Sequence, residues 1–214
     1  MNRFVRMIAA FALVAAVAGP PRASATSLAP LTHDQMVSAS DLIVEGTVLR
    51  TWAEEDEHGH IFTRAELQVD RVLKGHAAQG DVVTVESPGG VMADGRISDV
   101  SLAARYAAGE RTLVYLNEKR LGTVYGSVGM MMGKFTIRQN SVDGSDMVTR
   151  FTVPYHKAWD PRFLPSPKVE DRVSLASMES QVALSVAKGW DGQPIPGVPA
   201  EHLRLINKLQ PGVK

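Results

Sequence analysis

The densest group of chemically active side chains in this sequence lies within residues 54–60, which hold Glu54, Glu55, Asp56, Glu57, His58 and His60. Carboxylate oxygens and imidazole nitrogens are common ligands of divalent metals such as zinc. The candidate ligands of such a site are His58, His60, Glu55 and Glu57. The alternative interpretation is a solvated hairpin tip, because surface loops are polar for reasons of solvation alone.

Three consecutive methionines, Met130, Met131 and Met132, offer thioethers that bind Cu(I). On a strand, however, consecutive side chains face opposite sides, so the three cannot converge on one ion, and we predict that they fill the core. The sequence has no cysteine, which excludes thiolate chemistry. It also has no nucleophile elbow, phosphate loop or dinucleotide fingerprint. We therefore predict a protein that is not an enzyme and holds no cofactor.

The elements that must position these residues begin with two long strands between residues 41 and 75. Residues 61–69 alternate with period two, and Ala65, Leu67 and Val69 share the apolar face, as in a half-buried strand. The preceding strand, 42–49, contains Gly46, which predicts a bulge or bend. Before it, Thr32 and Gln35 have the spacing of a capping box, which predicts a short helix from residue 33 to about residue 40.

Further strands are predicted at residues 81–86, 110–116, 122–128, 134–138 and 147–153, the last after an Asp-Gly hairpin turn. Residues 91–109 are predicted to be irregular or to form one helical turn, with Tyr106 buried. These six or seven strands predict a mainly β fold, an OB-like closed or nearly closed antiparallel β-barrel with a short N-terminal helix and a C-terminal helical tail. The barrel domain spans residues 26–153.

Residues 154–214 differ in composition from the rest. Prolines and aromatic residues between 154 and 167 predict an extended strap laid over the barrel. Two short helices follow, one capped by Ser174 and ended by Gly189, the other from Pro199 to Leu209.

Residues 1–25 have the three regions of a secretory signal peptide: early arginines, an apolar run, and small residues at Ala23 and Ala25. The apolar run is shorter than the roughly 20 residues that span a bilayer, so we predict an exported protein, periplasmic, cell-surface or extracellular, without a membrane span after cleavage. Removal of three arginines leaves 20 basic and 23 acidic residues. That balance argues against nucleic acid as a partner, because phosphates require a concentrated basic surface.

Three stretches together resemble the opening of the netrin-like modules typified by tissue inhibitors of metalloproteinases: residues 39–48, the alternating strand, and residues 69–75 with their Lys-Gly ending. The chain is also similar to uncharacterised exported bacterial proteins that share Pro88–Gly90, Gly109–Glu110 and Gly133–Phe135. The resemblance covers about residues 32–140 and implies an OB-type five-stranded barrel with extra strands. The N-terminal cysteine through which those inhibitors reach the protease zinc has no counterpart here.

The function predicted from these features is that of an exported, non-enzymatic binding module. It would recognise a protein or saccharide ligand through barrel loops that carry His58, Pro88–Gly90 and Gly129, and a protease-inhibitor-like interaction protein is one form of it. The alternative is a metal-dependent hydrolase or metal carrier that uses residues 54–60. A third class is a structural envelope protein that assembles through its C-terminal helices.

Overall fold

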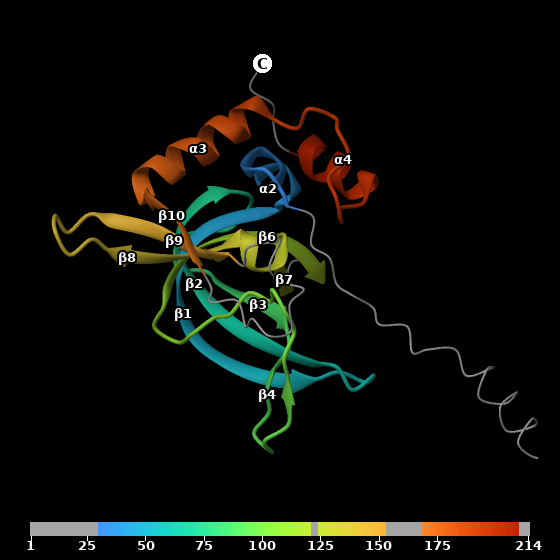
Figure 1. The fold of residues 1–214 in the computed structure, drawn as a ribbon. Helices are drawn as coiled ribbons and strands as arrows, with labels where there is room; N and C mark the ends of the chain where they lie inside the picture. The colour runs from blue at the N-terminus through green and yellow to red at the C-terminus, as the bar shows by residue number, and fades with distance from the viewer. Residues whose placement is uncertain (1–29, 121–123, 153–167, 210–214) are drawn as a thin grey trace, which may run out of the picture.

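The computed structural model describes residues 30–120, 124–152 and 168–209 (Figure 1). The predicted signal peptide and the predicted strap at 154–167 lie outside the described residues. The helical elements are α2 (His33–Ala39), the 3-10 helix η1 (Met130–Gly133), α3 (Leu175–Lys188) and α4 (Ala200–Leu209). The strands are β1 (Leu42–Glu55), β2 (Ile61–Lys74), β3 (Val82–Pro88), β4 (Gly90–Val91), β5 (Ile97–Ser98), β6 (Arg111–Arg120), β7 (Val124–Ser127), β8 (Lys134–Gln139), β9 (Asp146–Thr152) and β10 (Lys168–Ser174).

The mainly β prediction is confirmed: eight of these strands form one mixed sheet, in which a ring of hydrogen bonds runs through β1, β2, β3, β7 and β6 and back to β1. The expectation of wholly antiparallel pairing is wrong, because β3 and β7 are parallel. A ring of five strands cannot alternate in direction all the way round, so one pairing must be parallel. β8, β9 and β10 extend the sheet from β6.

Strand β1 pairs with two neighbouring strands, and Gly46 allows both pairings. β1 pairs with β2 along most of its length and with β6 through residues Leu42–Thr47. The β1–β2 register shifts between Glu45 and Gly46. A Cβ at Gly46 would lie 2.4 Å from the Gln68 carbonyl oxygen, so the close approach of β2 excludes a side chain there. The predicted irregularity at Gly46 is confirmed.

Two apolar cores lie on the two sides of this sheet. The first is inside the ring, where β1, β2, β3 and β6 contribute buried side chains and β7 contributes the partly buried Tyr125; its members include Val44, Val48, Ala65, Leu67, Val69, Val85, Val114 and Leu116. The second lies between the sheet and the helices and includes Val37, Ile43, Leu113, Tyr115, Phe135, Val148, Met178, Val182 and Leu203. Both faces of the first half of β1, residues 42–48, are therefore buried, which explains why this part reads as a largely apolar run rather than an alternating one.

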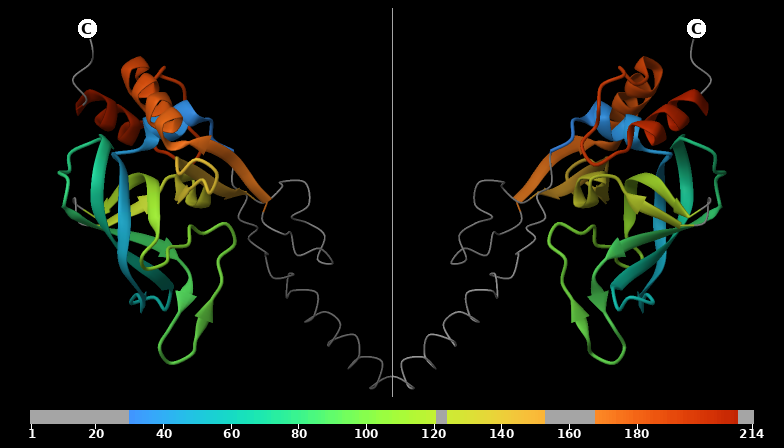
Figure 2. Two further views of the ribbon diagram at one scale, coloured as in Figure 1. Left: turned by 90° about the vertical axis from the view of Figure 1, so that its left-hand side faces the viewer. Right: turned by 90° about the vertical axis from the view of Figure 1, so that its right-hand side faces the viewer.

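The N-terminal helix and the C-terminal helices gather at one end of the molecule (Figures 1 and 2). Helix α2 begins at the predicted capping box, in which Thr32 and Gln35 each bind the other's backbone N–H. Helix α3 begins after Ser174, whose hydroxyl accepts the Ser177 N–H at 3.2 Å, and ends at Gly189 as predicted. None of these helices, within the part of the chain that the structure describes, is long and apolar enough to cross a membrane.

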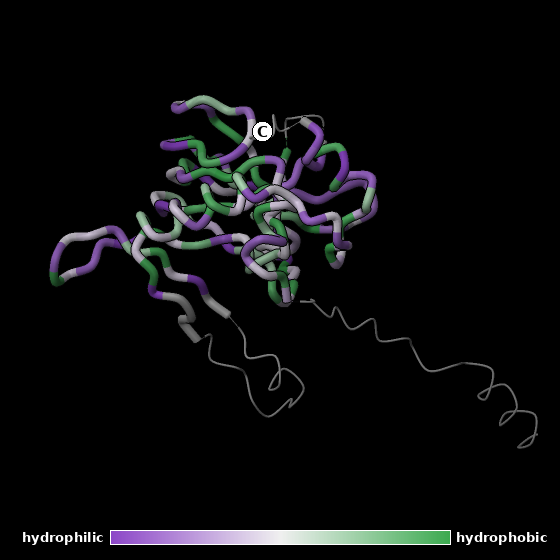
Figure 3. The backbone as a smooth tube through the Cα atoms, turned by 90° about the horizontal axis from the view of Figure 1, so that it is seen from above, coloured by the Kyte–Doolittle hydropathy of each residue, from purple (hydrophilic) through white to green (hydrophobic). Residues whose placement is uncertain are grey.

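Three segments differ from the sequence-based expectations. Strand β10, which pairs with β9, was not predicted, and neither was the β4–β5 hairpin within residues 90–98. Residues 130–132 form η1 rather than the start of a strand, because Gly129 and Met130 adopt left-handed backbone angles that turn the chain. Met132 still packs against the helix-side core, as expected of a core-filling residue. The turn between β8 and β9 projects from the sheet and is largely hydrophilic (Figure 3).

Candidate functional site

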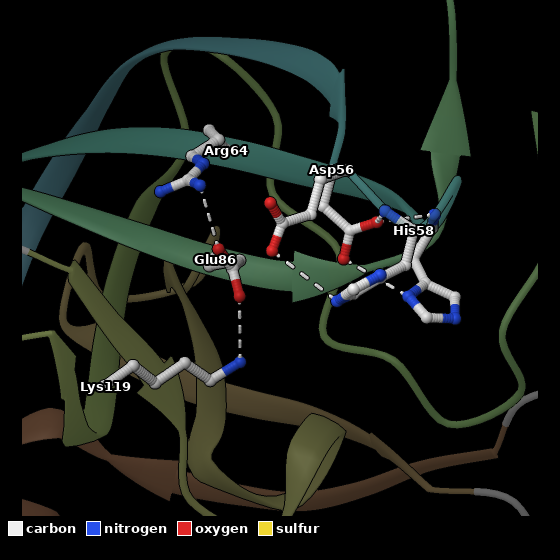
Figure 4. Close-up of polar contacts among 7 residues, drawn as sticks. Asp56, His58, Arg64, Glu86 and Lys119 are labelled. Carbon is white, nitrogen blue, oxygen red and sulfur yellow. Dashed lines mark hydrogen bonds and ion pairs between the residues drawn. The ribbon is translucent and has the colours of Figure 1, made fainter.

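The turn that joins β1 to β2 is organised by Asp56. One carboxylate oxygen of Asp56 accepts the backbone N–H groups of His58 and His60, at 2.9 and 2.8 Å, and the other lies 3.2 Å from His60 Nδ1 (Figure 4). These bonds, that of the His60 N–H foremost, lower the pKa of Asp56. Gly59 completes the turn with a φ of +82°. The carboxylate that lies at the centre of this loop therefore builds the turn.

The structure does not bring the four candidate metal ligands together. Glu55 pairs with Arg96 at 2.7 Å, and this contact lowers its pKa. Glu57 lies 3.5 Å from His58 Nε2 with both side chains exposed, and His60 turns toward Asp56. Among the described residues, no group of three or more His, Asp or Glu side chains could hold a metal ion. Glu55, one of the candidate metal ligands, is thus already paired with an arginine.

A chain of ion pairs crosses the outer face of β1, β2 and β3 beside this turn. Arg64 Nε lies 3.1 Å from Glu54, and Arg64 Nη2 lies 3.0 Å from Glu86, whose other oxygen is 3.2 Å from Lys119 Nζ (Figure 4). The side chains of Arg64 and Glu86 are only 14% and 10% exposed. Trp52 continues the row, donating from Nε1 to Glu54 at 2.5 Å. The alternation of β2 sets Arg64 on the face opposite Ala65 and Leu67, but its partners lie on other strands and leave no local signal in the sequence.

The β4–β5 hairpin lies next to the β1–β2 turn, and we call residues 55–61 and 89–98 together the hairpin end. The Gly89 N–H donates to the Ile61 carbonyl at 2.8 Å, and the Glu55–Arg96 ion pair joins the two hairpins. Both hairpins project at the end of the molecule opposite the helices (Figures 1 and 2). Val91 and Ile97 form a cross-strand pair in which each residue is mostly exposed, 65% and 69%. The loop that joins this pair carries Asp94 and Arg96, whose side chains lie 2.8 Å apart.

The segment Pro88–Gly90 has a structural role at this end. Gly89 has a φ of +84°, and a Cβ there would lie 2.6 Å from the Ser98 carbonyl oxygen. A Cβ at Gly90 would lie 2.6 Å from Thr63 Oγ1. Only glycine fits such a close approach at a positive φ. The motif therefore shapes the start of the β4–β5 hairpin.

The segments Gly109–Glu110 and Gly133–Phe135 meet each other inside the fold. Lys134 Nζ contacts the carboxylate of Glu110, which also accepts the Thr136 hydroxyl at 2.5 Å. The Tyr106 ring lies 5.7 Å from Lys134 Nζ, and Tyr106 is buried as predicted. Burial lowers the pKa of Lys134. The Gly109–Glu110 and Gly133–Phe135 motifs thus supply a half-buried ion pair that ties β8 to the start of β6.

A hollow of about 230 Å³ lies far from the hairpin end, between α2 and the loop that follows α3. Its polar groups are already bonded within the chain: Asp34 accepts from Ser185 and from Lys188, each at 2.5 Å. The indole N–H of Trp190 donates to the Gln193 carbonyl at 2.8 Å. Because these groups already hydrogen-bond to one another, they have little capacity left to bind a ligand in the hollow.

Neither a protein-family model nor a curated protein sequence matches this chain. The resemblance to netrin-like modules therefore stays a prediction.

Proposed function

We propose that this chain is an exported, non-enzymatic binding module, that its five-strand ring is an OB-type barrel, and that the hairpin end contacts a protein partner. Three observations support the OB-type assignment. The ring has five strands, β1 curves through a bulge to pair with two neighbours, and further strands extend one side. OB-type barrels bind ligands through the face of their second and third strands and the loop between the first two. In this chain those places are the ion-pair row and the β1–β2 turn.

The observation that carries the choice of partner is the exposed pair of Val91 and Ile97. Protein interfaces combine an apolar centre with a polar rim, and exposed apolar groups rimmed by polar residues mark such contacts. The Glu55–Arg96 ion pair holds the two hairpins side by side, so charged residues of the hairpin end such as Arg96, His58 and Glu57 would supply the rim. The hairpin end contains no Trp, Tyr or Phe that could stack on a sugar ring. The proposal therefore favours a protein over a saccharide.

Site-specific photo-crosslinking tests this function. A photoreactive residue replaces Val91 in one variant and, as the matched control, Val142 in another; Val142 is 91% exposed at the β8–β9 turn. In exporting cells, the substitution at Val91 is expected to give an adduct of defined mass with one envelope protein, and Ile97→Asp is expected to abolish it. Equal adducts from both positions, or an adduct that survives Ile97→Asp, would refute the proposed surface.

The metal-dependent alternative has its own test. If residues 54–60 form only a turn, excess zinc leaves the melting temperature of the purified protein unchanged, and the double variant His58→Ala, His60→Ala behaves as the wild type. A zinc-dependent rise in melting temperature that the double variant loses would favour the metal carrier instead. Binding of a metal to the folded state alone must raise stability by mass action, so this assay responds to any such site.

A further inference from the structure

Helix α3 is packed on the outside of the sheet by one apolar face. Leu175, Met178 and Val182 are buried there against a core that includes Ile43 of β1 and Leu113 of β6. Figure 1 shows α3 lying across the sheet beside α2. Such a stripe, repeated every three or four residues, is the usual way in which a surface helix is held.

Two acidic side chains meet at the edge of this apolar interface. Glu45 follows Ile43 by two residues on β1, is only 7% exposed, and has the carboxyl of Glu179 on α3 within hydrogen-bonding reach. Glu45 Oε1 is fully buried, and no donor among the described residues bonds to it. A buried polar atom without a partner is unfavourable, and two ionised carboxylates cannot bond to each other because neither carries a donor. A single proton shared by the pair removes both problems.

The positive charges nearby do not fully neutralise the two carboxylates, Glu45 and Glu179. Arg71, opposite Glu45 on β2, lies 2.6 Å from Glu179 and is the nearest cation. Arg111 of β6 makes a bidentate contact with Asp146 of β9, at 2.8 and 3.1 Å.

The neighbour of Arg71 on β2, Asp70, is itself acidic and accepts the Thr47 hydroxyl. The groups that face the Glu45–Glu179 pair from β2, β6, β9 and α3 thus include one arginine already bonded to Glu179 and one committed to Asp146. Like charges at short range favour protonation of one member of such a pair.

We infer that a shared proton between Glu45 and Glu179 holds α3 against the sheet, so that α3 opens more readily when this proton is lost. This inference concerns the helix end of the molecule and goes beyond the proposed function, which concerns the hairpin end. Burial foremost, and the Glu179 carboxyl next, raise the pKa of Glu45 to about 7 from its ordinary value of 4.5.

The direction of the pH dependence of α3 docking follows from this raised pKa. Because the docked state holds the proton more tightly than the open state, docking is strongest below pH 4.5, weakens as pH rises through about 7, and is level above that. A difference of about 2.5 pH units sets an upper limit of roughly 300-fold on the change in the open fraction. The apolar contacts of α3 do not titrate, so the helix stays mainly docked at either pH and only the open fraction changes.

The natural absence of cysteine makes this measurable with one introduced thiol. Val182→Cys places a thiol at a fully buried position of α3, and its labelling rate, divided by the rate of the denatured chain at the same pH, reports the open fraction. From pH 5 to pH 8 this ratio is expected to rise by up to roughly 70-fold, because a glutamate with its ordinary pKa of 4.5 is already mostly ionised in the open state at pH 5. In the Glu45→Gln background the rise is expected to fall below tenfold, because the amide is neutral at both pH values.

Three further variants make the result decisive. Glu66→Gln, at an exposed glutamate paired with Arg50, is the matched control and is expected to keep the full rise. Glu179→Gln removes the other acid of the pair and is expected to reduce the rise without abolishing it, because burial still raises the pKa of Glu45; this variant covers the case in which Glu45→Gln folds poorly. A second reporter, Val85→Cys inside the ring, is expected to show a much smaller rise. A flat wild-type profile, equal profiles for Glu45→Gln and Glu66→Gln, or equal rises at Val85 and Val182 would overturn the inference.

Discussion

Replacement of Lys74 by methionine tests how this fold holds a buried charge. Lys74 is 5% exposed at the end of β2, and its Nζ donates to the Val37 carbonyl of α2 at 2.6 Å. Methionine has nearly the same length but no charge, so Lys74→Met removes the charge and leaves the packing volume close to unchanged. The Val37 carbonyl keeps a partner, because it also accepts the Ser40 N–H at 3.3 Å.

The size of the expected stability change follows from the pKa of Lys74. Burial foremost lowers the pKa of Lys74 from 10.5 to about 8, which corresponds to a cost of about 3 kcal/mol for holding the charged amine in the folded state. That cost is present in full below pH 8 and disappears as pH rises from about 8 to 10.5, because the unfolded chain binds the proton more tightly. The lost hydrogen bond to a charged donor contributes about 2 kcal/mol in the opposite direction. At pH 7 the variant is therefore expected to be as stable as the wild type or about 1 kcal/mol more stable.

Urea unfolding at intervals from pH 7 to pH 9.5 measures the difference between the two proteins, in which titrations common to both cancel. The free energy of unfolding of the wild type is expected to rise by about 2 kcal/mol relative to Lys74→Met between pH 8 and pH 9.5. Lys208→Met, at an exposed lysine on α4, is expected to follow the wild type throughout. Parallel profiles for wild type and Lys74→Met, or a loss of more than 3 kcal/mol at pH 7, would refute the reasoning.

Three further predictions concern stability and are measured by the same unfolding assay. Lys134→Met leaves Glu110 half-buried without its cation and is expected to cost about 3 kcal/mol, much of which Glu110→Gln should restore in the double variant. Gly75→Ala is expected to cost at least about 2 kcal/mol, because φ is +95° and a Cβ would lie 2.3 Å from the Asp41 carbonyl oxygen. Val182→Ala, at a fully buried position of α3, is expected to cost about 2–3 kcal/mol through the cavity it leaves.

Each of these has an outcome that would contradict it. Additive effects of the Lys134 and Glu110 substitutions would show that the two side chains do not act as a pair. The matched control for Gly75→Ala is Gly80→Ala, which has a similar φ of +91° but open space around the Cβ, and equal costs for the two would exclude a steric role for Asp41. An unchanged stability in Val182→Ala would mean that α3 adds little to the core.

The helix caps and the half-buried strand were predictable because their signals are local. Thr32 and Gln35 lie three residues apart and meet in the first turn of α2, and Ser174 caps α3 in the same way. The alternation that ends at Val69 identified the buried face of β2 for the same reason, since the side-chain period of a strand is set by the backbone alone. The residue type of Gly46 was sufficient to locate the irregularity in β1.

The site residues were only partly predictable. Residues 56–60 were correctly placed in a turn, whereas Glu54 and Glu55 end strand β1, and their ion-pair partners Arg64 and Arg96 come from β2 and the β4–β5 hairpin. The metal hypothesis needed Glu55 as a ligand, but Glu55 pairs with Arg96, which the folding of the β4–β5 hairpin brings beside it. The β4–β5 hairpin and its exposed Val91–Ile97 pair were missed because two-residue strands leave almost no periodic signal.

What the sequence by itself determined, then, is the helix caps, the longer strands with their buried faces and most of the turns between them. Only the tertiary structure decided that five strands close a ring of hydrogen bonds with one parallel pairing, and that Glu110 meets Lys134 and Glu45 meets Glu179. The physical reason is that these arrangements join residues far apart in the chain, and no short-range rule of backbone geometry or side-chain spacing couples them. They form when apolar burial on both faces of β1 brings distant segments together, and the polar groups trapped there must then find partners among whatever lies opposite.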